Sequence, residues 1–294
     1  MVAVWAEADW VWADEFRDGN VPAQQAPLTC AKLAFAALPE TITQRYFRRD
    51  SAGHEQELLA WLKHPEREQE PGGRIGFAVR AVMSDPLAKA LRKIKAADWQ
   101  TFDQEEEGTL RQWAEVDFVP GEACERKESR PSRSVGLRLL KPQGVLFGDG
   151  TDRHFHAVVT HQKIDGGRLL AWHREKAGMI EHPHDEVKNA FGGGHVPSQR
   201  FGVNSAWFKG SLLTYNWVRA IKGLCLGAEE RTARMKRFRL LLIQVAGRMN
   251  RNNCVLGLRL CHHTQALKRM QKVWQVFELP TQATSAKALG GRGG

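Results

Sequence analysis

Long hydrophobic runs are missing from this sequence of 294 residues. No stretch of about 18 apolar residues occurs, so we expect neither a membrane-spanning helix nor a membrane partner. The amino-terminal stretch MVAVWAEADWVWADEF is acidic and has no basic flank, which argues against a signal peptide. We therefore expect a soluble, globular protein of the cytoplasm.

Cysteine is also scarce, and the five cysteines are scattered without a CxxC pair. An odd, dispersed set argues against both a disulfide framework and a structural zinc site. Two motifs are absent as well. No GK[ST] follows a glycine-rich turn, and no GxSxG is found, so neither a phosphate loop nor a hydrolase triad is supported.

Acidic residues are rare in the second part of the chain. Residues 1–120 hold 14 Lys and Arg against 20 Asp and Glu, whereas residues 121–294 hold 29 against 13. The last hundred residues carry 17 basic and three acidic side chains. This asymmetry favours a polyanion partner for the C-terminal part, and the alternative is a basic, solvated surface without a partner. Arg234, Lys236 and Arg237 form a cluster suited to the DNA backbone.

Strands and helices alternate in the first part of the chain and helices dominate afterwards, which predicts an α/β domain with one sheet and helices on its faces. Expected strands are a hairpin within 2–13, then 44–49, 73–82, 111–119, 133–141 and 155–161. Expected helices are 28–38, 51–63, 84–97, 172–191, 204–225 and 229–250. The low-apolar end, 281–294, is expected to be disordered.

Asp50 ends a short strand and is followed by the small residues Ser51, Ala52 and Gly53. Functional groups gather at strand ends in open α/β sheets, and small residues allow a ligand to approach the backbone. Asp50 is therefore a candidate metal ligand. The alternative is that it caps the helix expected over 51–63.

A second candidate lies in HREKAGMIEHPHDEVKNAFGGG, residues 173–194. On a helix, Glu181, His184 and Lys188 would share one face. Such a glutamate suits Mg²⁺, and the lysine suits a neighbouring phosphate. The alternative is a solvated glutamate that never meets the lysine. In the next helix, 204–225, apolar residues cover nearly every face and are expected in the core, with Arg219 and Lys222 projecting from its end.

Five segments together resemble the DDE transposases of bacterial insertion sequences, which have a ribonuclease H-like catalytic core. They are ADEFRDGNVPA, YFRRDSAGHEQELLAWL, GRIGFAVRA, AEVDFVPGE, and the long stretch that begins HREKAGMIEH and runs to LLTYN. They follow the family's order over about residues 1–260. The resemblance implies a mixed sheet flanked by helices, a β-rich insertion at about 100–165 and a basic helical C-terminal region.

The resemblance also implies an enzyme in which acidic residues hold Mg²⁺, or Mn²⁺, for DNA strand cleavage and strand transfer at transposon ends. Asp50 and Glu181 match two of the family's three acids. Lys176, Lys188 and Arg174 would contact DNA. The implied partners are the double-stranded terminal inverted repeats and target DNA, engaged by a homodimer in association with the nucleoid.

Two departures from the family pattern stand out. His173 replaces the motif's tyrosine, which would weaken a phosphate contact. The family's first Asp would precede Met1, so the resemblance implies a truncated copy, and the alternative function is an inactive remnant that only binds DNA. The expected domains are a truncated core with its insertion (1–168), C-terminal helices that complete the core and contact DNA (169–260), and a basic, flexible tail (261–294).

Overall fold

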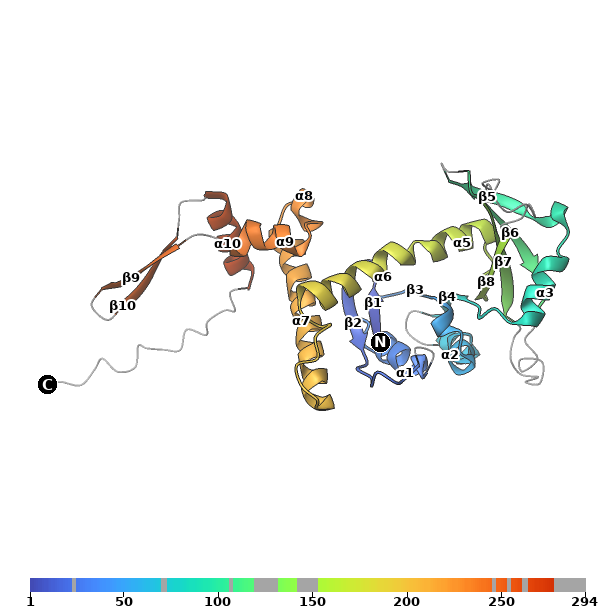
Figure 1. Cartoon of the computed structure of the whole chain (residues 1–294), viewed down its shortest axis with the longest axis horizontal. Coiled ribbons are helices and arrows are strands. Elements are labelled where there is room, and N and C mark those ends of the chain that lie inside the picture. Colours follow the sequence, from blue (N-terminus) through green and yellow to red (C-terminus); the bar gives the residue numbers. More distant parts are fainter. Residues whose placement is uncertain are drawn as a thin grey trace. The chain divides into compact units, whose positions relative to one another are not determined.

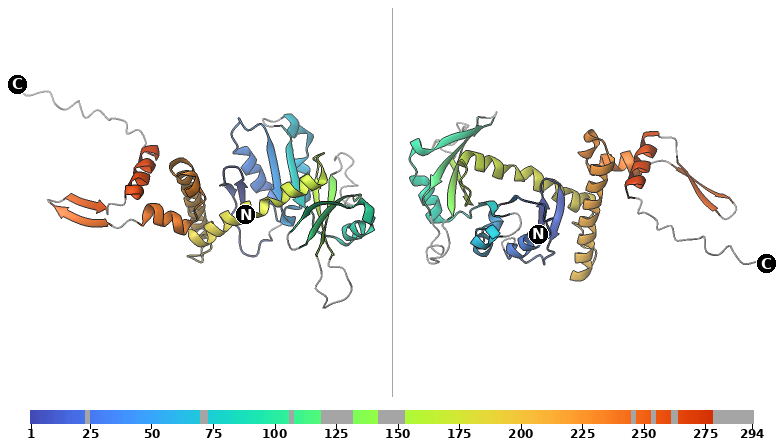
Figure 2. Two further views of the ribbon diagram at one scale, coloured as in Figure 1. Left: turned by 90° about the horizontal axis from the view of Figure 1, so that it is seen from above. Right: turned by 180° about the vertical axis from the view of Figure 1, so that it is seen from behind.

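The structure is a computed structural model with two compact units, Met1–Pro183 and His184–Gly294. The residues it describes are 1–22, 25–69, 73–105, 108–118, 132–141, 153–244, 247–252, 255–260 and 264–277. The expected disorder at 281–294 therefore lies outside the described residues. Figures 1 and 2 show the chain from three directions.

A six-stranded sheet organises the first unit, with the strand order β3-β4-β8-β7-β6-β5. Its strands are β3 (Arg45–Arg49), β4 (Ile75–Arg80), β5 (Gln100–Gln104), β6 (Leu110–Val116), β7 (Arg133–Leu140) and β8 (Arg153–Thr160). β3 and β4 run parallel, and the remaining neighbours run antiparallel. The sheet is therefore mixed, and the five strands predicted over these residues are confirmed within a few residues at their ends.

Helices pack on both faces of this sheet, because the strand β4 is buried on both sides. The helices are α1 (Pro27–Ala36), α2 (Gln56–Leu62), α3 (Asp85–Lys93), α5 (Gly166–Arg174) and α6 (Lys176–Asp185). Phe77 and Val79 of β4 pack with α2 and α3, whereas Ala78 packs with α5 on the other face. In Figure 1, α5 lies on one side of β3 and β4, and α1 and α2 lie on the other.

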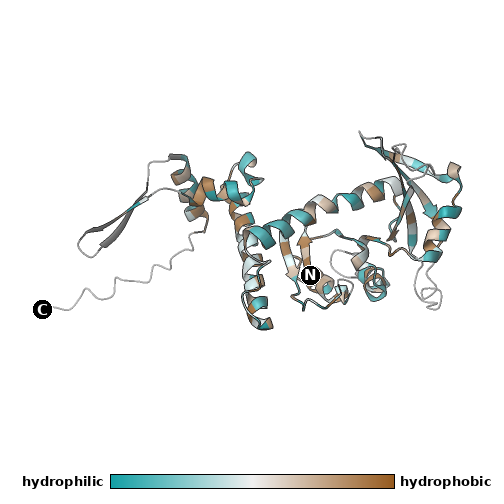
Figure 3. Cartoon of the chain, in the orientation of Figure 1, coloured by the Kyte–Doolittle hydropathy of each residue, from teal (hydrophilic) through white to brown (hydrophobic). Residues whose placement is uncertain are grey.

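The expected amino-terminal hairpin is confirmed. β1 (Val2–Trp5) pairs antiparallel with β2 (Trp10–Asp14) in a sheet of two strands. Trp5 and Trp12 meet edge to face with ring centroids 5.0 Å apart, which stabilises the pair beyond simple area burial. Figure 3 shows the hydrophobic residues of β1.

The second unit contains helices and one further hairpin. Its elements are a π-helical turn, η4 (Glu186–Ala190), then α7 (Phe201–Cys225), α8 (Ala228–Arg231), α9 (Met235–Phe238), a second π-helical turn η5 (Arg239–Ile243), β9 (Gly247–Asn252), β10 (Val255–Leu260) and α10 (Thr264–Phe277). The single helix predicted over 229–250 is wrong, because its end is the strand β9. Gly247, Asn250 and Asn252 are poor helix formers, which accounts for the break. Residues 264–277 of the expected tail form α10.

The prediction that α7 is core on nearly every face is also wrong. Trp207, Leu213 and Trp217 are 48%, 60% and 49% exposed, since this 25-residue helix buries only one side. Lys222 does not project from the helix end as expected. It is only 1% exposed, and its Nζ lies 3.7 Å from Oε1 of buried Glu186. Periodicity alone cannot show which stripe of an all-apolar helix finds a partner.

The predicted fold class is confirmed. The first unit is a mixed α/β structure, consistent with a ribonuclease H-like fold, in which β5 to β8 extend the sheet between β4 and α5. Within the part of the chain that the structure describes, no helix is both long and apolar enough to cross a membrane.

Candidate active site

Asp50 lies at the carboxyl end of the parallel pair β3 and β4, where α/β sheets commonly place ligands. It is exposed, and its Oδ1 accepts a hydrogen bond from the Ala52 amide at 3.1 Å. This bond caps the short 3-10 turn η1 (Ser51–Gly53). The helix α2 has a different cap, Glu55, whose carboxylate accepts from the amides of Glu57 and Leu58. Asp50 therefore keeps its second oxygen for other partners.

Gly53 is required by the packing behind Asp50. A Cβ atom at this position would overlap the aliphatic stem of Arg49. Burial lowers the pKa of Arg49, and the Asp50 carboxylate opposes that change. The small residues after Asp50 thus make room for an arginine stem, which the expectation of a ligand approach had not considered.

Glu181 and Lys176 lie on α6, which follows α5 after a single residue, Glu175. Glu181 is exposed and Lys176 is half-buried. Burial lowers the pKa of Lys176, whereas the charges of Asp50 and Glu181 raise it. One ammonium group therefore interacts with both predicted carboxylates. Asp50 and Glu181 are 131 positions apart in the sequence, and the charge of each bears on the pKa of Lys176.

Two further arginines, to which the sequence assigns no role, also act on Lys176. Arg48 and Arg80 both act electrostatically on Lys176 and lower its pKa, after the larger effect of burial. Arg48 ends β3 together with Arg49, and Arg80 ends β4. The signal was present in the sequence, since an arginine stands at the end of each of the two strands that form the parallel pair.

Arg174 has carboxylate partners in the structure. Its guanidinium lies 2.7 Å from Asp103 Oδ2 and 3.1 Å from Glu105 Oε1. Arg111 binds the same two acids. This cluster ties α5 to β5 and β6, so Arg174 would have to exchange these partners to contact DNA.

The remaining predicted DNA contacts lie in the second unit. Lys188 is exposed on the π-helical turn η4, and with burial it lowers the pKa of His184. Arg234, Lys236 and Arg237 are exposed at α9. These four side chains are solvent-accessible cations, as a phosphate contact requires.

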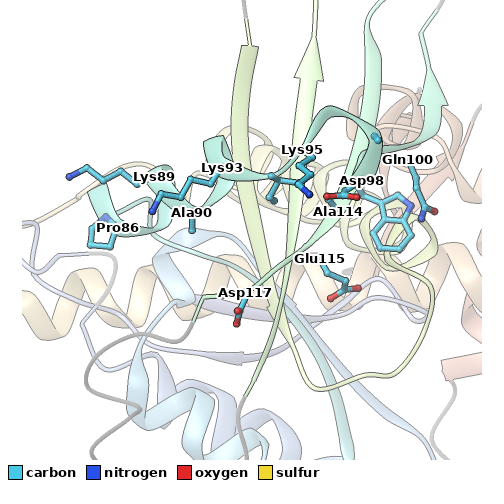
Figure 4. A pocket seen from close by; sticks show the side chains of 13 residues that line it. Pro86, Lys89, Ala90, Lys93, Lys95, Asp98, Gln100, Ala114, Glu115 and Asp117 are labelled. Carbon is cyan, nitrogen blue, oxygen red and sulfur yellow. The ribbon is translucent and has the colours of Figure 1, made fainter.

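A hollow of about 970 Å³ opens elsewhere in the first unit, between α3 and β6 (Figure 4). Lys89, Lys93 and Lys95 line it together with Asp98 and Asp117. Neither Asp50 nor Glu181 contributes to its lining. The hollow near α3 is therefore separate from Asp50 and Glu181.

The donor chemistry suits a hard divalent cation, but the donor set is small. Asp50 and Glu181 provide carboxylate oxygens, the ligands that Mg²⁺ prefers. Among the described ranges, no group of three or more His, Cys, Asp and Glu side chains is placed to hold a metal ion.

Comparison with known proteins identifies the family of the chain. A family model described as Transposase DDE domain group 1 matches residues 4–280. The chain belongs to the DDE transposases. The resemblance expected from the sequence is thereby confirmed, and no curated protein matches the chain.

In a DDE transposase, charged groups near the end of β3 and β4 would face a DNA backbone. Asp50 and Glu181 raise the pKa of Lys176, whereas burial and the charges of Arg80 and Arg48 lower it. A surface of this kind can attract a phosphodiester backbone by charge and bring it to the acids. The family implies a transposition enzyme that acts on DNA and generally uses a divalent metal.

Proposed function

We propose that this transposase cleaves DNA at the ends of its element and joins them to target DNA, with Mg²⁺ or Mn²⁺ held by Asp50 and Glu181. The proposal is supported by the family match over residues 4–280 and by the place of Asp50 at the carboxyl end of β3, with Lys176 and Glu181 on the helix that follows α5. When bound, divalent ions would supply Lewis acidity and orient the attacking and leaving oxygens. The chain's own residues hold the ions and position the backbone.

The cations divide into two groups by their expected work. Lys176 would hold the phosphate beside the acids, and Arg48 and Arg80 would join it only after leaving Glu175 and His156, respectively. Lys188, Arg234, Lys236 and Arg237 would bind the backbone of the terminal inverted repeats or the target, each contact releasing counterions. Arg174 would join them only after leaving Asp103 and Glu105. We further propose that a homodimer associated with the nucleoid carries out these steps.

A strand-cleavage assay tests the proposal. The substrate is linear duplex DNA that carries the element's own ends, incubated with Mg²⁺ or Mn²⁺. Asp50→Asn and Glu181→Gln should each abolish cutting, because each removes a carboxylate donor at nearly constant size. Glu57→Gln is the matched control, since Glu57 is an exposed carboxylate in the first turn of α2. Equal cutting by all four proteins would contradict the assignment of both acids.

A second candidate function is DNA binding without cleavage. It is favoured by the lack, within the described residues, of three clustered metal-binding side chains. Two-metal phosphoryl transfer needs a clamp on both the attacking and the leaving oxygen, which two carboxylates hold less well than three. Salt-dependent binding to the same duplex, with no cutting in either metal, would favour this candidate.

A further inference from the structure

Two consecutive residues of β3, Arg48 and Arg49, form hydrogen bonds with two consecutive residues of α5, Trp172 and His173. His173 is 8% exposed, and its Nε2 lies 3.0 Å from the carbonyl oxygen of Arg49. A carbonyl can only accept, so the ring must donate through Nε2–H. The Arg49 carbonyl belongs to the peptide bond that leads into Asp50. The contact therefore fixes the peptide plane from which the Asp50 side chain departs.

Arg48 makes the second contact between β3 and α5. Its Nη1 donates to the carbonyl oxygen of Trp172 at 2.5 Å and lies 3.1 Å from Glu175 Oε2. Its guanidinium also stacks over the Trp172 ring, 5.0 Å from the centroid. Charge-assisted bonds of this kind are stronger and more directional than neutral ones. The end of β3 is thus held at two adjacent points on the last turn of α5.

The helix that β3 holds, α5, is followed by the helix that carries the second acid, Glu181. α5 ends at Arg174, and α6 begins at Lys176 and carries Glu181. A hydrogen-bonded helix transmits position over a few residues with little play. Only Arg174 and Glu175 lie between His173 and Lys176, so the contact of His173 with the Arg49 carbonyl bears on where α6, which carries Lys176 and Glu181, begins relative to Asp50.

We propose that His173 is a positioning residue, which with Arg48 sets the separation between the Asp50 carboxylate and the helix that carries Lys176 and Glu181. This inference rests on the proposed function, because the separation matters most if both acids hold the same ions. It assigns His173 a role in the protein interior, in place of the weakened phosphate contact that the sequence suggested. Its burial under the end of β3 is inconsistent with a direct phosphate contact.

The role asks for a hydrogen-bond donor, and an apolar ring of similar size would not supply one. A single neutral hydrogen bond contributes only about 1 kcal/mol to folding stability. A misplacement of about 1 Å at reacting groups, in contrast, costs about 100-fold in rate. A positioning role thus predicts a small loss of stability with a large loss of cleavage. A purely structural role predicts the reverse.

The test compares His173→Phe, which fills the space without a donor, with His173→Gln, whose amide nitrogen can replace Nε2–H. Single-turnover cleavage of the element's ends in Mn²⁺ should fall about 10- to 100-fold in His173→Phe and recover to within about 5-fold of the wild type in His173→Gln. The dissociation constant for the same duplex should change less than 2-fold in both. Equal cleavage by the two variants would overturn the proposal. If the phenylalanine variant does not fold, His173→Leu serves in its place.

A second readout does not depend on cleavage. The amides of Ala52 and Gly53 are bonded to the Asp50 side chain and carbonyl, respectively. Hydrogen exchange at residues 50–53 should be faster in His173→Phe and restored in His173→Gln, while exchange in α2 stays unchanged. This pattern in a protein that never cuts DNA would retain the positioning role and reject the proposed function. If the wild type cuts DNA and His173→Phe cuts it equally well, the proposed function is retained and the positioning role is rejected.

Discussion

Acid should destabilise the first unit through His156. Arg80 donates from Nη2 to Nδ1 of this ring at 2.7 Å, so the ring is neutral where the contact forms. Burial, together with the charge of Arg80, lowers the pKa of His156 to about 4. In the unfolded chain a histidine titrates near its ordinary pKa of about 6.5. Between these values the unfolded chain binds a proton that the folded chain does not, and stability is lost as the pH falls from about 6.5 to about 4.

The size of this loss follows from the two pKa values. A difference of about 2.5 units corresponds to at most about 3.4 kcal/mol once the pH is below both values. The ring keeps part of its contact with water, and screening there reduces the effect to about half. At pH 4.5, where titration is incomplete, we expect His156 to account for about 1 kcal/mol.

Urea unfolding at pH 7 and pH 4.5 measures this loss, with His156→Gln as the comparison. The glutamine keeps an acceptor for Arg80 but does not titrate, so its free energy of unfolding should fall about 1 kcal/mol less than that of the wild type over the same interval. Other histidines, such as His161 with a pKa of about 4, contribute equally to both proteins and cancel. Identical pH dependence in the two proteins would refute the reasoning.

Two further substitutions probe packing. Lys222→Met should lower the free energy of unfolding by about 3–5 kcal/mol because it leaves buried Glu186 without its cation, and the double variant Glu186→Leu/Lys222→Met should regain most of that loss in urea titrations. A double variant as unstable as the single one would contradict this. Gly166→Ala should cost about 1–3 kcal/mol in thermal unfolding, since a Cβ atom would overlap the Trp113 ring. Gly178→Ala on α6, where a Cβ atom meets nothing, should instead stabilise by about 0.5–1 kcal/mol, and equal effects at the two glycines would be inconsistent with the packing at Trp113.

The pattern of apolar residues predicted the strands of the sheet better than any other feature of the sequence. The stretch around Ile75–Arg80 is a continuous apolar run, and it forms the strand that is buried on both faces. The start of the helix expected over 84–97 is also correct, because Ser84 Oγ accepts a hydrogen bond from the Leu87 amide and caps α3, although α3 already ends at Lys93. These features are local, so they are visible in one stretch of sequence at a time.

Contacts between distant segments could not be predicted in the same way. Arg174 was expected to face DNA, and its pairing with Asp103 depends on how α5 lies against β5. His173 was judged from a family motif, whereas its partner is a backbone carbonyl on β3. A backbone partner leaves no mark in the sequence. The assignment of Asp50 and Glu181 as metal ligands stays a prediction.

The pairing of β4 with β8 also bears on how the chain is made. Ala78 lies opposite Thr160, so 82 residues separate partners in the middle of the sheet. At a synthesis rate of about 5–20 residues per second, the apolar strand β4 leaves the ribosome about 4 to 16 seconds before β8 exists to cover its edge. Non-local pairing of this kind also slows folding after release. During this interval one edge of β4 has no partner strand, and Glu181 is synthesised only after the interval has ended. A chaperone that binds extended apolar segments would act in this window.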